Sequence, residues 1–152
     1  SLKDGKLTLS LNDTGSSLPS FTGDWTSFRG SDTNNGVTDA PIPTAAQDGT
    51  LYWANQLGVG FDSDAVGSPI LVDGDIITYA GDKIYRVDTV SGEIKAKAAM
   101  DHKSSFSITP PVYADGMVFV ALSGGTVQAF NAATLESLWI YTDPLGGSQT
   151  AR

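Results

Sequence analysis

The feature that most constrains this chain is an internal repeat, in which residues 68–100 recur from residue 110 onward. The pair Asp73-Gly74 matches Asp115-Gly116, at a spacing of 42 residues. One extra residue in the turn at 123–125 raises the spacing to 43 for the rest of the repeat. A unit of this length cannot bury its apolar face alone, so the repeat predicts units that stack against one another.

Turn signals divide each repeat into four short strands. Asp73-Gly74 predicts a tight hairpin, because glycine tolerates the positive φ that such turns need. Charged and apolar residues alternate over 93–98, which is typical of an outer strand with one solvent-exposed face. Residues 117–122 are continuously apolar, which predicts a strand covered on both faces. Strands are expected at 68–72, 75–80, 83–90 and 93–98. The predicted fold class is all-β: a β-propeller of four-stranded antiparallel blades, of which this chain supplies about two blades plus an early outer strand.

The tryptophans extend this pattern toward the N-terminus. Trp53, Ala96 and Trp139 are spaced by 43 residues, so all three occupy the same position in a last strand. We therefore expect an outer strand near Trp53 that closes the last blade of the ring. We expect an N-terminal strand and loop over residues 1–24, an entry segment over 25–49 and this outer strand over 50–58. The two blades are expected over 68–100 and 109–143, and a truncated start of the next inter-blade connection over 144–152.

Composition limits the partners. The net charge of −8 argues against nucleic acid and anionic membrane surfaces, and no apolar run is long enough to span a bilayer. Cysteine is absent, which excludes disulfides and thiolate metal sites. Two blades cannot close a ring. The expected partner is therefore a second fragment of the same propeller, or another copy of this chain through self-association.

The motifs Trp25-x-x-Phe28-Arg29-Gly30, Ser68-Pro69 with Asp73-Gly74, Val87-Asp88-x-x-Ser91-Gly92-Glu93 and Glu136-x-x-Trp139 together resemble the PQQ-binding-like (quinoprotein-type) β-propeller repeat family. This family mixes quinone-dependent dehydrogenases with non-catalytic scaffolds and cell-surface proteins. The resemblance implies that the tryptophan ending each repeat docks on the neighbouring blade, which assigns structural blade docking to Trp53 and Trp139. Because the first blade has Ala96 there, we expect its docking contact to be weaker or filled by another side chain.

The aromatic-plus-arginine group Trp25, Phe28 and Arg29 is the candidate ligand-binding set. These side chains can stack on a sugar or a quinone, or they can pin the segment against the propeller's side; the packing interpretation is favoured, since large aromatics mostly serve packing. No catalytic, cofactor-binding or metal residue is predicted. His102 lies in a polar loop and is expected to be solvated. Calcium at Asp62-x-Asp64 is disfavoured, because the position of the bidentate glutamate is an aspartate.

We expect a non-catalytic extracytoplasmic module (periplasmic, secreted or at the cell surface) that binds protein or carbohydrate or acts as a scaffold, without a cofactor. The alternative is a fragment of a PQQ-dependent dehydrogenase whose active site lies partly in blades absent from this chain. The resemblance implies that such a site needs calcium, a catalytic aspartate and a tryptophan platform. None of these can be placed here, and fold alone does not decide between the two functions.

Overall fold

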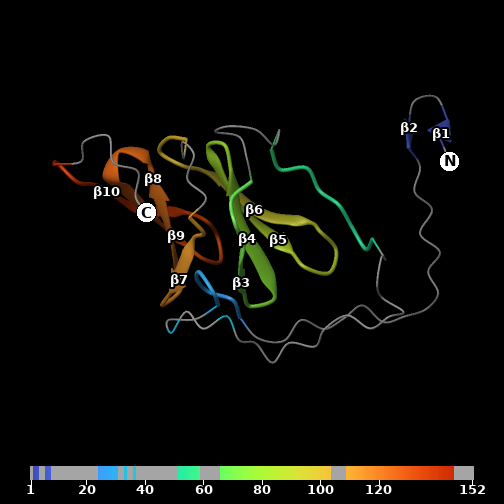
Figure 1. The fold of residues 1–152 in the computed structure, drawn as a ribbon, viewed down its shortest axis with the longest axis horizontal. Helices are drawn as coiled ribbons and strands as arrows, with labels where there is room; N and C mark the ends of the chain where they lie inside the picture. The colour runs from blue at the N-terminus through green and yellow to red at the C-terminus, as the bar shows by residue number, and fades with distance from the viewer. Residues whose placement is uncertain are drawn as a thin grey trace.

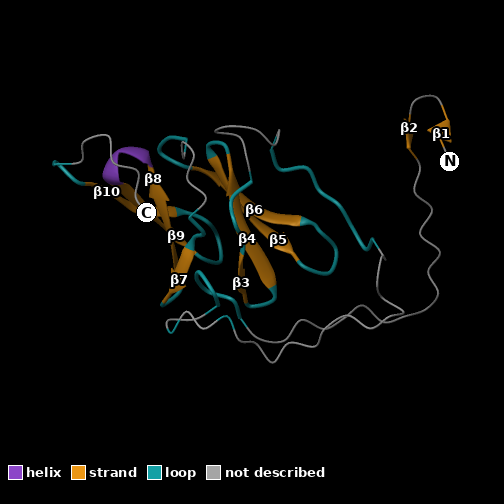
Figure 2. Ribbon diagram, viewed as in Figure 1, coloured by secondary structure: helices purple, strands orange, loops and turns teal. Residues whose placement is uncertain are grey.

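The computed structural model describes residues 2–3, 6–7, 24–30, 33, 36, 51–58, 66–103 and 109–145, and every structural statement below concerns these residues. Two four-stranded antiparallel sheets stand side by side (Figures 1 and 2) and confirm the all-β fold class. The first blade has strands β3 Ile70–Val72, β4 Asp75–Ala80, β5 Lys83–Asp88 and β6 Ile94–Ala99. The second has β7 Val112–Ala114, β8 Met117–Leu122, β9 Thr126–Asn131 and β10 Ser137–Thr142. Near the N-terminus, β1 Leu2–Lys3 pairs antiparallel with β2 Lys6–Leu7.

The first hairpin of each blade has the same turn, as the sequence predicted. Asp73 and Gly74 have φ of 50° and 77°, and Asp115 and Gly116 have φ of 49° and 77°. Two successive residues with positive φ define the hairpin turn whose twist matches the flanking strands. Local turn chemistry therefore sets the register of both first hairpins.

The turn between the last two strands also repeats. In the first blade the Asp88 Oδ1 atom accepts the N–H groups of Val90 and Ser91, at 2.9 and 2.8 Å. In the second blade Asn131 Oδ1 accepts the equivalent N–H groups, at 2.9 and 3.1 Å. A side-chain oxygen that caps its own turn explains why each repeat carries Asp or Asn there.

The main core lies between the two blades. The face of the first blade that carries Ile77 and Tyr79 packs on the face of the second that carries Val118 and Val120. The inner strands β3 and β7 contact each other, and β6 and β10 lie at the outer ends of the sheets. On β8, alternate residues are buried against the first blade and the others are partly exposed. The described residues therefore cover only one face of this strand, where the sequence predicted two.

Residues 51–58, where the sequence predicts an outer strand, have no strand partner among the described residues. A strand needs a ladder partner, and no described strand pairs with this segment. Trp53 and Leu57 instead pack on the other face of the first blade, beside Tyr85 and Val87. Whether this segment completes a last blade remains a prediction.

Candidate ligand-binding pocket

Residues 24–30 lie across the inner edges of both blades. The N–H of Trp25 donates to the carbonyl of Leu71 at 2.9 Å, and the N–H of Leu71 donates back to Trp25 at 2.7 Å. The N–H of Tyr113 on β7 donates to the carbonyl of Thr26 at 2.8 Å. The segment is thus held by main-chain hydrogen bonds to both β3 and β7, at the inner edges and not against the propeller's side.

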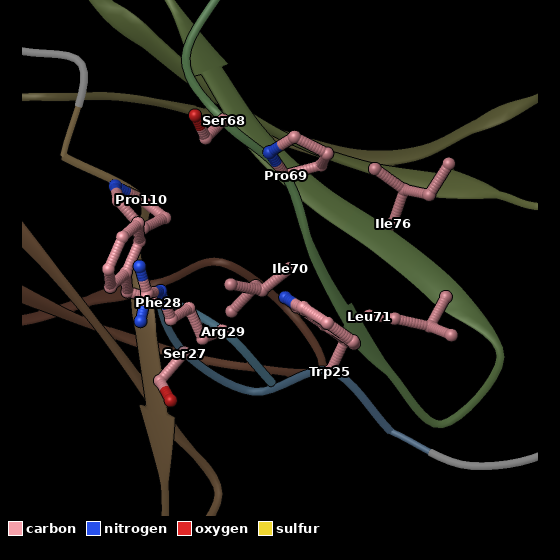
Figure 3. Close-up of a pocket in the computed structure, with 10 residues that line it drawn as sticks. All are labelled: Trp25, Ser27, Phe28, Arg29, Ser68, Pro69, Ile70, Leu71, Ile76 and Pro110. Carbon is pink, nitrogen blue, oxygen red and sulfur yellow. The ribbon is translucent and has the colours of Figure 1, made fainter. Parts of the chain in front are cut away.

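An open pocket of about 460 Å³ lies between this segment and the inner strands. Figure 3 shows its walls: Phe28, Arg29 and Pro110 gather on one side, with Trp25 and Leu71 on the other. The full lining comprises Trp25, Ser27, Phe28, Arg29, Ser68, Pro69, Ile70, Leu71, Ile76 and Pro110. The structure therefore brings all three candidate residues to one concave site.

A turn over residues 27–30 positions the charged group. Arg29 has a φ of 58° and Gly30 a φ of 88°, and the Gly30 N–H donates to the Ser27 carbonyl at 3.0 Å. A Cβ on Gly30 would lie 2.9 Å from the Trp25 ring, so the tryptophan rests directly on this turn. The Arg29 guanidinium lies 5.4 Å from the ring centroid of Phe28, a cation–π distance, and Phe28 is 61% exposed.

The chemistry of the lining is apolar with one positive charge. Aromatic, proline and aliphatic side chains form the walls, and Arg29 is the only ionisable group among them. No lining side chain is a carboxylate or an amide. Calcium prefers such oxygen ligands, so the lining does not fit the calcium–quinone site implied by the dehydrogenases. The pocket fits an apolar ligand with an anionic group.

A second set of contacts joins each blade to the part of the chain that precedes it. The Trp53 indole N–H donates to the Thr89 carbonyl at 2.8 Å, and its ring lies on Gly92, where a Cβ would come within 2.5 Å. The Arg86 Nη1 atom donates to the carbonyl of Ala132 at 2.6 Å. Thr89 and Ala132 are equivalent positions of the repeat. The same carbonyl of each blade thus accepts a donor from the preceding segment.

Arg86 fills the docking position that Ala96 leaves open. Arg86 and Ala96 face each other across β5 and β6, and the equivalent pair in the second blade is Ala129 and Trp139. In the first blade the large side chain, Arg86, lies on β5 and the small one on β6. In the second blade the small side chain lies on β9 and the large one, Trp139, on β10. Sequence reasoning missed Arg86, although a charged residue inside the third strand was a visible signal. The indole of Trp139 packs on Phe119, with ring centroids 5.8 Å apart, and remains 44% exposed.

His102 is not simply solvated, which corrects the prediction. Its Nδ1 atom lies 2.9 Å from Asp101 Oδ2, and its Nε2 atom lies 2.9 Å from the Ser123 carbonyl. The hydrogen bond to Asp101 is the main cause that raises the pKa of His102. Asp62 and Asp64 lie outside the described residues. In the described part of the chain, no group of three acidic, His or Cys side chains is arranged to hold a metal ion.

The stacked blades and their docking contacts define a β-propeller module. Residues 41–152, more than half of the chain, match the family model described as outer membrane protein assembly factor BamB, and the chain belongs to this PQQ-like repeat family. Among solved structures the chain is similar to BamB from Moraxella catarrhalis, with 15% sequence identity and a TM-score of 0.41. That alignment covers 46% of this chain and 20% of the BamB chain, so the chain spans a small share of that protein. No curated protein matches. The described residues contain no helix long and apolar enough to cross a membrane.

Proposed function

We propose that this chain is a non-catalytic binding or scaffolding module that works outside the cytoplasm, and that the pocket at the inner strands takes its ligand. The family description, an outer-membrane assembly factor, supports the location and the scaffolding role. The observation that carries the binding site is the gathering of Trp25, Phe28 and Arg29 on one pocket. Fractionation of cells that express the native gene tests the location, and recovery in the cytoplasm would contradict it.

Of the two ligand classes, protein and carbohydrate, the pocket favours protein. Apolar walls suit an aliphatic or aromatic side chain, and the Arg29 guanidinium suits a carboxylate, which it can hold with two parallel hydrogen bonds. A sugar needs many polar partners, and apart from Arg29 the lining side chains offer only the Ser68 hydroxyl and the Trp25 indole N–H, since the Ser27 hydroxyl is buried. The proposed ligand is therefore a peptide segment with an apolar residue beside a carboxylate.

The test follows the indole signals of the three tryptophans by NMR during titration. The probes are a short peptide that ends in Phe with a free carboxylate, the same peptide as its amide, and maltotriose. We expect the free-acid peptide to shift the Trp25 signal, assigned with Trp25→Phe. Phe28→Ala and Arg29→Gln should weaken binding about tenfold each, which corresponds to the loss of about one charge-assisted hydrogen bond or aromatic contact.

The control is Val90→Ala, since Val90 is also exposed and does not line the pocket. It should bind the peptide as the wild type does. Binding that is equally strong for the amide, or unchanged in Arg29→Gln, would contradict the proposed role of the charge. A response to maltotriose alone would favour the carbohydrate ligand instead.

The proposal includes a partner for the outer face of the second blade. Phe119, Trp139 and Tyr141 share the face that, in the first blade, packs against its neighbour. We propose that further blades of the same ring cover it, whether they come from the same propeller or from another copy. Native mass spectrometry tests this: a chain that stays monomeric at high concentration would contradict cover by another copy, and a recovered complex should lose its partner in Trp139→Ala.

A further inference from the structure

The outer rims of the two blades differ in one respect. On β6, Lys95 and Lys97 occupy two positions of the rim strand, and the equivalent positions of β10 are Leu138 and Ile140. Lysine on an edge strand prevents other chains from pairing with it. The first blade therefore carries this protection, and the second does not.

The strand β10 has the properties of a strand that accepts another strand. Its six residues, SLWIYT, include no charge and no proline, and all six are exposed. One edge pairs with β9, and no described strand pairs with the other edge. Leu138 and Ile140 are 45% and 47% exposed. Aliphatic and aromatic residues of this kind favour extended pairing, and an open edge offers main-chain donors and acceptors.

A neighbouring blade does not explain the exposure of Ile140, whereas Leu138 lies at a β-bulge and has no Cα partner on β9. Ile140 pairs with Gln128, whose side chain is buried on the face toward the first blade, so the neighbour on that side is already present. A further blade would pack on the opposite face, which carries Trp139 and Tyr141. Blades pack face to face, whereas strand addition occurs in the plane of the sheet. Completion of the ring therefore leaves the edge of β10 open.

Charge indicates what kind of strand fits. Glu136 directly precedes β10 and Asp143 directly follows it, and both side chains are exposed. Between Lys103 and Arg152 the sequence contains no lysine or arginine. The two acids are separated by roughly 23 Å along an extended chain at 3.3 Å per residue. Opposite charges placed across paired strands stabilise the pairing, and like charges destabilise it.

We propose that β10 is a docking strand for an extended segment of a partner protein, in which apolar residues alternate and a basic residue stands at each end. The segment adds as a fifth strand parallel to β10, the direction in which its alternating apolar residues face Leu138 and Ile140 while its two end residues face Glu136 and Asp143. Main-chain hydrogen bonds supply much of the affinity, the apolar side chains cover Leu138 and Ile140, and the two basic residues face Glu136 and Asp143. This surface is separate from the pocket at the inner strands.

The experiment measures binding of the fluorescent peptide KTVTVTVK to the full chain by fluorescence anisotropy. Leu138→Thr with Ile140→Thr removes the apolar cover but keeps strand-forming residues, and should weaken binding about tenfold. Glu136→Gln with Asp143→Asn leaves the strand itself untouched, and should weaken binding severalfold and reduce its salt dependence. The matched control Lys97→Thr should bind as the wild type does, and far-UV circular dichroism checks that each variant folds.

Two altered peptides separate strand addition from unspecific attraction. The peptide ETVTVTVE should bind less tightly than KTVTVTVK, and N-methylation of alternate peptide groups should abolish binding, because it removes donors that the edge needs. The proposal is overturned if KTVTVTVK does not bind, if N-methylation has no effect, or if the Leu138/Ile140 variant binds equally well. It is also overturned if the wild type forms dimers through β10 that exclude the peptide, because the occupant is then a second copy.

Discussion

Arg86 links the two blades, because it pairs with Asp75 within the first blade and donates to the Ala132 carbonyl of the second, and its loss is the most informative perturbation. The Arg86 Nε atom lies 2.6 Å from Asp75 Oδ2, and the Asp75 side chain is 4% exposed. Arg86→Ala removes this pair and the hydrogen bond from Nη1 to the Ala132 carbonyl. Removal of one partner from a buried pair costs about 3–5 kcal/mol. Lys95 still contacts Asp75 at 2.7 Å, so we expect the free energy of unfolding to fall by about 2–4 kcal/mol.

Urea unfolding followed by circular dichroism and tryptophan emission measures this change. The matched control is Lys83→Ala, which removes an exposed ion pair to Asp82 at 2.9 Å and should have little effect, because exposed pairs contribute little. The double variant Asp75→Asn with Arg86→Ala should lose less than the sum of its single changes. A loss below about 1 kcal/mol in Arg86→Ala would show that Arg86 does not hold the blades together, and strictly additive losses would show that its pair with Asp75 contributes nothing to this.

A second experiment on the contact between the two blades transfers residues of the second blade to the equivalent positions of the first. Replacing Asp75 by Met, Arg86 by Ala and Ala96 by Trp gives the first blade the residues that the second blade carries at these positions. The new indole at position 96 needs space on the second blade. On the first blade the Trp53 ring rests on Gly92, and the residue of the second blade that is equivalent to Gly92 is Leu135. We expect the three changes together with Leu135→Gly to be more stable than Arg86→Ala, and the three changes alone to be less stable than the four.

Three further predictions concern contacts within the blades. Gly92→Ala places a Cβ 2.5 Å from the Trp53 ring at a φ of 73°, so urea unfolding should show a loss of about 1–3 kcal/mol together with a shift of tryptophan emission. Gly67→Ala places a Cβ 2.5 Å from the buried ring of Tyr79, and a comparable loss should appear as a lower Tm, whereas an unchanged Tm would show that the ring moves freely. The pKa of His102 is raised above its ordinary 6.5, so its contacts stabilise the fold fully below that pH and are lost as pH rises through the raised pKa; solvent screening keeps the effect below about 1 kcal/mol, and His102→Gln should remove this part of the pH dependence of Tm.

The parts of the fold that the sequence predicted are those set by local chemistry. Asp73-Gly74 forms its hairpin because two adjacent residues accept positive φ, and nothing distant is needed. The position of Trp25 was not predictable in this way. Its hydrogen bonds go to Leu71, and a pairing over such a separation depends on how the blades stack. Arg86 was missed for the same reason, because the role of a side chain in an interface depends on its cross-strand neighbour and on the next blade together.

The repeat also shows where the specific properties of the molecule lie. Positions that the two blades share, such as Asp73 and Asp115 in the first turns, serve the geometry of any blade and carry no information about partners. Positions where the blades differ decide what each surface contacts. The exchange of Arg86 for Ala129 changes an interface between blades, whereas the exchange of Lys97 for Ile140 changes a rim that no described element covers. Because an exposed apolar rim strand promotes association and gives nothing back to the isolated fold, the second exchange supports the proposed docking of a partner strand on β10.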